Sequence, residues 1–92
     1  MKHAGREALD SLEPLLCLLR EVPGLREKSR GTFYRSSRAF MHFHEDPSGL
    51  FADLRLDTEF ERIRVTTAEE QRRLMRSVRQ ATQSVSESKV HR

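Results

Sequence analysis

The first hydrophobic pattern along the chain has helical spacing and lies within Ala8–Val22. Pro14 is tolerated in the first turn of a helix, so the helix begins either after a cap at Asp10 or Ser11 or, in a kinked form, near Gly5. Pro23-Gly24 ends it, because proline cannot continue a helix. The apolar stripe consists of Leu12, Leu15, Leu16 and Leu19.

A second helical pattern runs from about Ala68 to Ser84. Thr66 and Thr67 each have a glutamate three residues later, which is the spacing of a capping box at a helix start. Residues 85–92 are mostly polar, and we expect them to form a flexible tail. The stripe of this helix consists of Leu74, Val78, Ala81 and Val85.

Between the helices, apolar and polar residues alternate in four short segments, which is the period of a β-strand. Short breaks rich in Ser, Asp, Pro and Gly separate the segments and suit antiparallel hairpins. The predicted fold class is α+β, with residues 1–84 forming a single domain. In it, a four-stranded antiparallel meander lies between an N-terminal and a C-terminal helix, both packed on one face. The predicted strands are Thr32–Arg35, Arg38–Glu45, Leu50–Leu56 and Glu61–Val65.

The lengths of the predicted turns decide which side chains share a face of the sheet. A four-residue Asp46–Gly49 loop pairs His42 with Asp53, and a four-residue Asp57–Phe60 loop places Arg62 beside Arg55. A two-residue turn at Ser36-Ser37 places Phe33 beside Phe40. The face left open by the helices would then carry Phe33, Phe40, His42, His44, Phe51, Asp53, Arg55, Arg62 and Arg64.

This open face is unusual for a surface that meets only water, where Thr, Lys and Glu would be expected. Aromatic and arginine side chains are enriched in protein interfaces, so we expect a binding surface for another protein or for a second copy of the chain. Single-stranded nucleic acid is the alternative partner, because bases stack on aromatic rings and arginine contacts phosphate.

Composition indicates where in the cell the protein is expected. Charged residues make up 34% and hydrophobic residues 36% of the chain, and the net charge is +3. No apolar run is long enough to span a bilayer, and there is no signal-peptide pattern or cysteine pair, so we expect a cytoplasmic protein without membrane contact. The single cysteine, Cys17, lies in the leucine-rich run and is expected to be a buried or half-buried thiol.

Candidate chemistry is limited to a few groups. His42 and His44 have the spacing of a two-histidine metal pair, with Asp53, Glu45 and Asp46 nearby. No third histidine or cysteine is expected near them, so the sequence predicts no metal and no cofactor. A cross-strand hydrogen bond from His42 to Asp53, raising the imidazole pKa, is the simpler interpretation.

An enzyme is not favoured by the sequence. A hydrolase would need a nucleophile beside a base, and Ser48 near His44 lies in a turn without a nucleophile-elbow motif. Phosphate-binding and dinucleotide-binding glycine motifs are absent from the sequence as well.

Residues 41–56, with the sequence MHFHEDPSGLFADLRL, resemble a hairpin of the luciferase-like family of uncharacterised bacterial domains. The shared features are a His-x-His pair, a glycine-containing turn and an alternating strand. The strand that runs through Ile63 into an amphipathic helix is similar in order. The resemblance covers about half the chain and implies no defined reaction, so it favours a binding domain.

Overall fold

The structure, a computed structural model, describes the backbone of residues 1–90 and the side chains of residues 1–83. The predicted α+β class is confirmed, with two helices and an antiparallel sheet. The sheet has six strands in this described part, so the prediction of four strands was too low. The elements are β1 Lys2–His3, α1 Arg6–Arg20, β2 Leu25–Ser29, β3 Thr32–Arg35, β4 Arg38–Asp46, β5 Gly49–Arg55, β6 Phe60–Arg64 and α2 Ala68–Val90.

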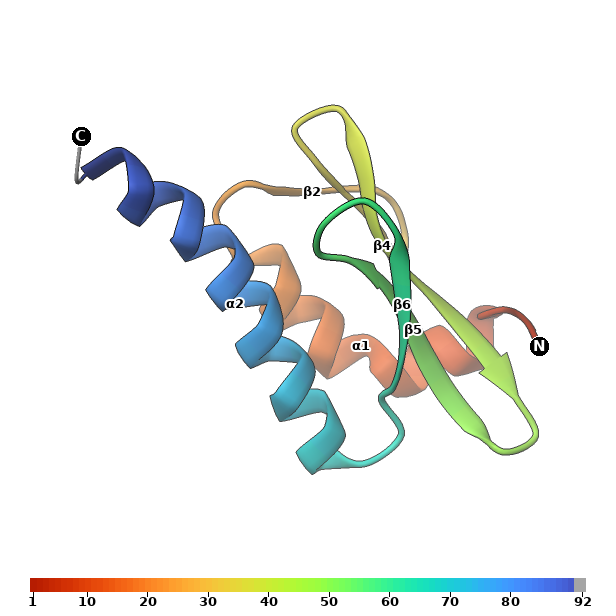
Figure 1. Cartoon of the computed structure of the whole chain (residues 1–92). Coiled ribbons are helices and arrows are strands. Elements are labelled where there is room, and N and C mark those ends of the chain that lie inside the picture. The colour runs from red at the N-terminus through yellow and green to blue at the C-terminus, as the bar shows by residue number, and fades with distance from the viewer. Residues whose placement is uncertain (91–92) are drawn as a thin grey trace.

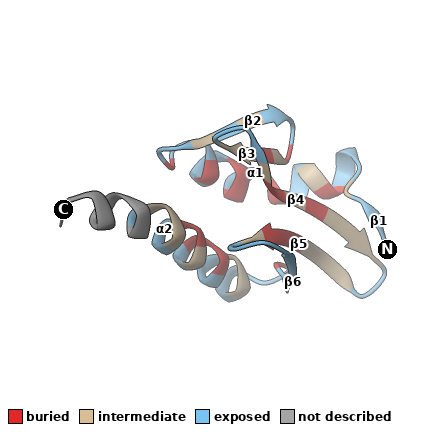
Figure 2. Cartoon of the chain, turned by 45° about the horizontal axis from the view of Figure 1, so that its top comes forward, coloured by how far each residue is buried: buried red, intermediate tan, exposed pale blue. Residues whose placement is uncertain are grey.

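The strands follow one another in the sheet in the order β2-β3-β4-β5-β6 (Figure 1). The first half of the long strand β4 pairs with β3, and its second half pairs with β1. Strand β1 therefore lies beside the end of β4, on the edge of β4 that pairs with β3 nearer its start (Figure 2).

Both helix starts are fixed by glutamate side chains. Helix α1 begins after Gly5, whose N–H donates to Glu45 Oε2 at 2.6 Å, so the earlier of the two predicted starts is right and Pro14 lies inside the helix. At α2, Thr67 Oγ1 accepts from the Glu70 N–H and Glu70 Oε1 accepts from the Thr67 N–H, which confirms a capping box. Helix α2 continues past its predicted end to Val90. The side chains of the predicted 85–92 tail all lie outside the described residues, as does the backbone of residues 91–92.

The two helices cover the same face of the sheet and share one core with it (Figure 1). The leucine stripe of α1 is buried as predicted. Cys17 falls off that stripe and is exposed, so the expectation of a buried or half-buried thiol was wrong. From the sheet and α2 the core takes Met41, Phe43, Ala52, Leu54, Leu74 and Val78.

The β4–β5 hairpin has the predicted register, with His42 opposite Asp53 and Phe43 opposite Ala52. The β5–β6 hairpin differs from the prediction, because Asp53 pairs with Arg62 and Arg55 pairs with Phe60. This is a slip of two residues. A slip of two leaves every side chain on its predicted face and changes only its neighbour.

Two of the predicted open-face residues are in the core instead. The Ser36-Ser37 turn has the predicted length, but a β-bulge follows it, so Phe33 pairs with Met41 and not with Phe40. Phe33 is fully buried and Phe40 is 4% exposed, and both pack in the core. The open face therefore loses two of its three predicted phenylalanines.

Neither helix, among the described residues, combines the length and the apolar character that a transmembrane span requires.

Candidate functional site

The open face is centred on the second half of β4, where His42 and His44 point away from the helices. The predicted neighbours Phe51 and Asp53 lie on β5 beside them, as expected. Phe51, His42 and His44 are half-buried, and Asp53 is only 8% exposed. The sequence therefore located the centre of this face correctly, while Phe33 and Phe40 lie elsewhere.

A third histidine joins this centre. Strand β1 places His3 directly opposite His44, with their rings stacked at 4.7 Å between centroids. The expectation that no third histidine lies nearby was wrong. One nitrogen from each imidazole lies within 4.8 Å of the other two. We call His3, His42 and His44 the histidine cluster.

Phe60, which the predicted open face did not include, closes one side of the cluster. Its ring lies 5.0 Å from that of His42, centroid to centroid, and 39% of the residue is exposed. The slip in the β5–β6 register brings Phe60 opposite Arg55, whose guanidinium stacks over the ring at 4.7 Å. The sequence could have indicated Phe60 only if the four-residue turn had been placed one residue earlier.

Asp53 carries the negative charge of the site. Arg62 donates to both carboxylate oxygens, from Nε to Oδ1 at 2.8 Å and from Nη2 to Oδ2 at 2.9 Å. These bonds lower the pKa of the Asp53 carboxyl, which therefore stays ionised at neutral pH.

The imidazole that contacts Asp53 is that of His44, not the predicted His42. His44 Nε2 lies 3.1 Å from Asp53 Oδ2 and 3.1 Å from His42 Nδ1. An ionised carboxylate only accepts, so His44 Nε2 carries the proton in this contact. The other nitrogen, His44 Nδ1, is buried and has no hydrogen-bond partner among the described residues.

The predicted rise in the pKa of His42 is also wrong. Burial lowers its pKa, and this effect outweighs the attraction of Asp53. His42 is therefore neutral at pH 7, with a lone pair on one of its ring nitrogens.

Two further polar side chains that the sequence singled out, Arg64 and Ser48, are hydrogen-bonded to other groups of the protein. Arg64 donates to the Glu70 carboxylate at 3.0 Å and to the Ser48 carbonyl at 3.1 Å. The Ser48 hydroxyl donates to Asp46 Oδ2 at 2.6 Å and not to a histidine. Within the described residues, this turn therefore holds no serine paired with a histidine base.

A hollow of about 300 Å³ lies at one end of the sheet, where the β3–β4 and β5–β6 turns approach each other. We call it the arginine hollow, because three arginines line it. Leu56, 43% exposed, lies on its edge. The lining residues are Arg35, Ser36, Arg38, Ala39, Phe40, Arg55, Leu56 and Asp57.

The arginines of the hollow have no carboxylate partner among the described residues. Arg55 donates to the Ala39 carbonyl, and Arg35 donates to the Ala81 carbonyl of α2. Arg35 also lies over the Phe40 ring. Of the described lining residues, Asp57 alone brings a negative charge, so the lining of the hollow is positive.

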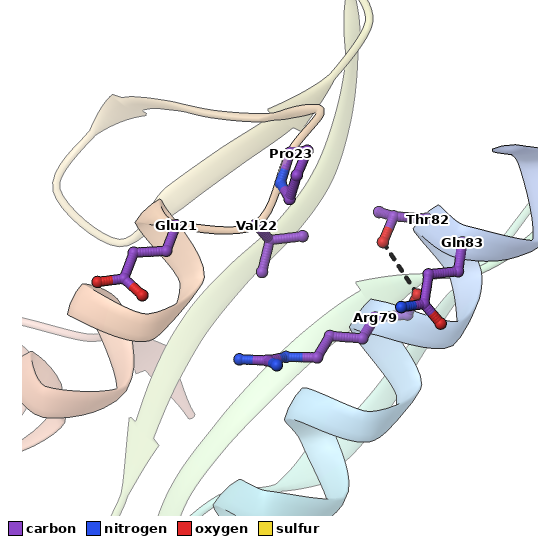
Figure 3. Close-up of a pocket in the computed structure, with 6 residues that line it drawn as sticks. All are labelled: Glu21, Val22, Pro23, Arg79, Thr82 and Gln83. Carbon is purple, nitrogen blue, oxygen red and sulfur yellow. Dashed lines mark hydrogen bonds between the residues drawn. The ribbon is translucent and has the colours of Figure 1, made fainter.

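Another pocket, of about 330 Å³, lies between the end of α1 and α2 (Figure 3). Among its described lining residues, Glu21 and Arg79 are the charged ones, and Thr82 Oγ1 is bonded to the backbone of its own helix. These described residues form no cluster of catalytic or metal-binding groups, and we place the candidate site on the open face.

Comparison with known proteins gives no relative: no protein-family model matches the chain, and no curated protein or solved structure does so either. The chemistry of the open face is therefore the basis for a functional proposal.

Proposed function

We propose that the protein is a small binding domain that recognises a segment of another protein at the end of its open face, beside the arginine hollow. The observation that carries the proposal is a pair of exposed apolar side chains on one hairpin. Leu56 is 43% exposed and Phe60 is 39% exposed. Large exposed apolar groups next to arginine are typical of the centre of a protein interface.

The charges select the kind of partner. Three arginines and one aspartate line the hollow. A partner segment that carries acidic side chains together with an apolar anchor would complement this end of the sheet. A second copy of the chain would bring arginines against arginines there, which is unfavourable. We therefore favour a different protein, and self-association becomes an outcome of the test.

Nucleic acid has less support. Phe33 and Phe40 are buried and cannot stack on bases. Arg62 and Arg64 are paired with carboxylates, so a phosphate would have to compete with Asp53 and Glu70 for them.

The test is selection from a phage-displayed library of random peptides on the immobilised full chain. Enriched peptides should combine Asp or Glu with Leu, Phe or Trp. Their affinity should fall by at least about tenfold for Phe60→Ser, since an anchoring aromatic contributes more than about 1.4 kcal/mol. Leu18→Ser is the matched control, because Leu18 is 45% exposed on α1 and lies outside the hollow.

Two outcomes would reject the proposal. One is a library that yields no enriched acidic and apolar peptide. The other is a set of peptides that bind wild type and Phe60→Ser equally. Light scattering on the free protein runs in parallel, and a dimer that Phe60→Ser dissociates would identify a second copy as the occupant instead.

A further inference from the structure

The histidine cluster carries an inference that goes beyond protein binding and does not depend on it. We propose that His3, His42 and His44 together bind one divalent transition-metal ion of the Zn²⁺ class, each through one imidazole nitrogen. The ion would join the start of the chain to the centre of the sheet, because His3 lies on β1 and the other two histidines lie on β4.

The distances in the cluster suit such an ion. Two nitrogens bound to a tetrahedral ion at about 2.0 Å lie about 3.3 Å apart. His42 Nδ1 and His44 Nε2 are 3.1 Å apart, so an ion can take the place of the hydrogen bond between them with little movement. His3 supplies a nitrogen within 4.8 Å of both, and its exposed side chain can turn to close this remaining distance.

The hydrogen bonding at His44 Nε2 favours an ion at this point. His44 Nε2 faces two acceptors at 3.1 Å, Asp53 and His42, and has one proton to share between them. An ion bound by His44 Nε2 and His42 Nδ1 would replace this shared proton and remove the competition.

The surrounding charges permit a cation. Arg62 is a fixed positive charge that acts on His42, and its bidentate pair with Asp53 offsets it. Because both Asp53 oxygens already accept from Arg62, we assign Asp53 the role of balancing the charge of the ion and not that of a ligand. Positions on the ion that the histidines do not fill are left to solvent on the side of the exposed His3.

The donor set selects the kind of ion. Neutral imidazole nitrogens suit Zn²⁺, Cu²⁺ and Ni²⁺, whereas Mg²⁺ and Ca²⁺ prefer oxygen ligands. Three histidines with a position open to solvent are also the ligand set of some catalytic zinc sites, while structural zinc sites are closed by four protein ligands.

The experiment is a calorimetric titration of the full chain, purified without a polyhistidine tag and freed of metal by a chelator that is then removed. Zn²⁺ should bind at one ion per chain with low-micromolar affinity or tighter, and Mg²⁺ should not bind. His3→Gln should weaken Zn²⁺ binding by at least about tenfold. The matched control is Lys2→Gln, which alters the neighbouring residue of the same short strand and should bind as wild type does.

Two further measurements separate a metal site from a general effect on folding. Co²⁺ should give a visible absorption band in wild type and Lys2→Gln that is absent in His3→Gln. Zn²⁺ should raise the melting temperature of the first two proteins and not of the third, because a ligand stabilises only the state that binds it.

The proposal is overturned if Zn²⁺ shows no saturable binding, or if His3→Gln binds Zn²⁺ as tightly as wild type does. Peptide binding at the arginine hollow is measured separately in the presence of chelator. A loss of metal binding with peptide binding retained, or the reverse, therefore shows which of the two proposals has failed.

Discussion

At the residue scale, the features that define the open face are polar contacts that cross between strands. Asp53 is nearly buried and joins β5 to β6 through Arg62 and to β4 through His44. A buried carboxylate is tolerated only when it is paired in this way. Asp53 therefore orients the His44 ring and the Arg62 guanidinium and supplies a negative charge to the site.

A second polar network ties α1 to the turn that follows β2. Glu13 accepts from Arg20 Nη1 at 2.7 Å and from Arg30 Nη2 at 2.8 Å. These two arginines lower the pKa of the Glu13 carboxyl from 4.5 to about 2, the bond from Arg20 being the larger cause. Because the pKa is depressed in the folded state, the stabilisation is present above pH 4.5 and is lost as the pH falls toward 2.

We predict that Glu13→Gln makes the acid side of the stability curve shallower. Urea unfolding midpoints, measured from neutral pH down to pH about 2, should fall more steeply for wild type than for the variant in the window below pH 4.5. Glu69→Gln is the control, since its partner Arg73 is highly exposed and such a pair contributes little. Curves for wild type and Glu13→Gln that run parallel would contradict the prediction.

At the scale of elements, the bulge in the β3–β4 hairpin has the largest effect on the open face. It turns Phe33 into the core and leaves Phe60 as the exposed phenylalanine among those described. The sheet therefore has an apolar covered face and an open face dominated by polar groups and histidine rings.

The bulge gives a test by paired substitutions. Phe33→Ala should lower the free energy of unfolding by about 3–5 kcal/mol, the usual cost of emptying a buried aromatic site. Phe60→Ala should cost much less, because its ring is 39% exposed. Urea denaturation measures both. If Phe33→Ala is already unfolded in buffer while Phe60→Ala folds, the prediction also holds. Equal losses for the two variants would contradict the position of the bulge.

The elements that the sequence predicted are those with a regular pattern. Both helices and strands β3 to β6 show their period clearly, and the β4–β5 register follows from a strong turn signal at Asp46–Gly49. Strand β2, with the sequence LREKS, has one apolar residue and no alternation, as is common for an edge strand protected by charge. Strand β1 has only two residues, too few for any period.

The features of the site that the sequence did not predict depend on segments without a clear sequence pattern. His3 could not be placed beside His44 without β1, so the cluster of three was not predictable. The β5–β6 slip was hidden because both registers keep Ile63 on the covered side. The bulge at Phe40 had no sequence signal, since it contains neither glycine nor proline.

At the scale of the whole molecule, one core connects every large element. Side chains from α1, β3, β4, β5 and α2 belong to the same buried cluster. A chain of this size with a single core unfolds in one cooperative step.

We predict that unfolding of the sheet and of the helices coincides. Near-ultraviolet circular dichroism reports on the environment of Tyr34 in β3, and the far-ultraviolet signal reports mainly on the two helices. Both signals should give the same urea midpoint and the same slope. Separate midpoints would show that α2 or the sheet forms an independent unit.

The shared edge of β4 has a kinetic consequence. Strand β1 is held there by two paired residues and by the bond from the Ala4 N–H to the Phe43 carbonyl at 3.0 Å, whereas β5 pairs with β4 along six residues. Detachment of β1 thus costs a small part of the free energy of global unfolding. Each such opening removes His3 from the other two histidines while the sheet stays intact. The affinity of any ligand that needs all three rings is therefore scaled by the fraction of time that β1 is closed, and its release rate can follow the opening of one short strand.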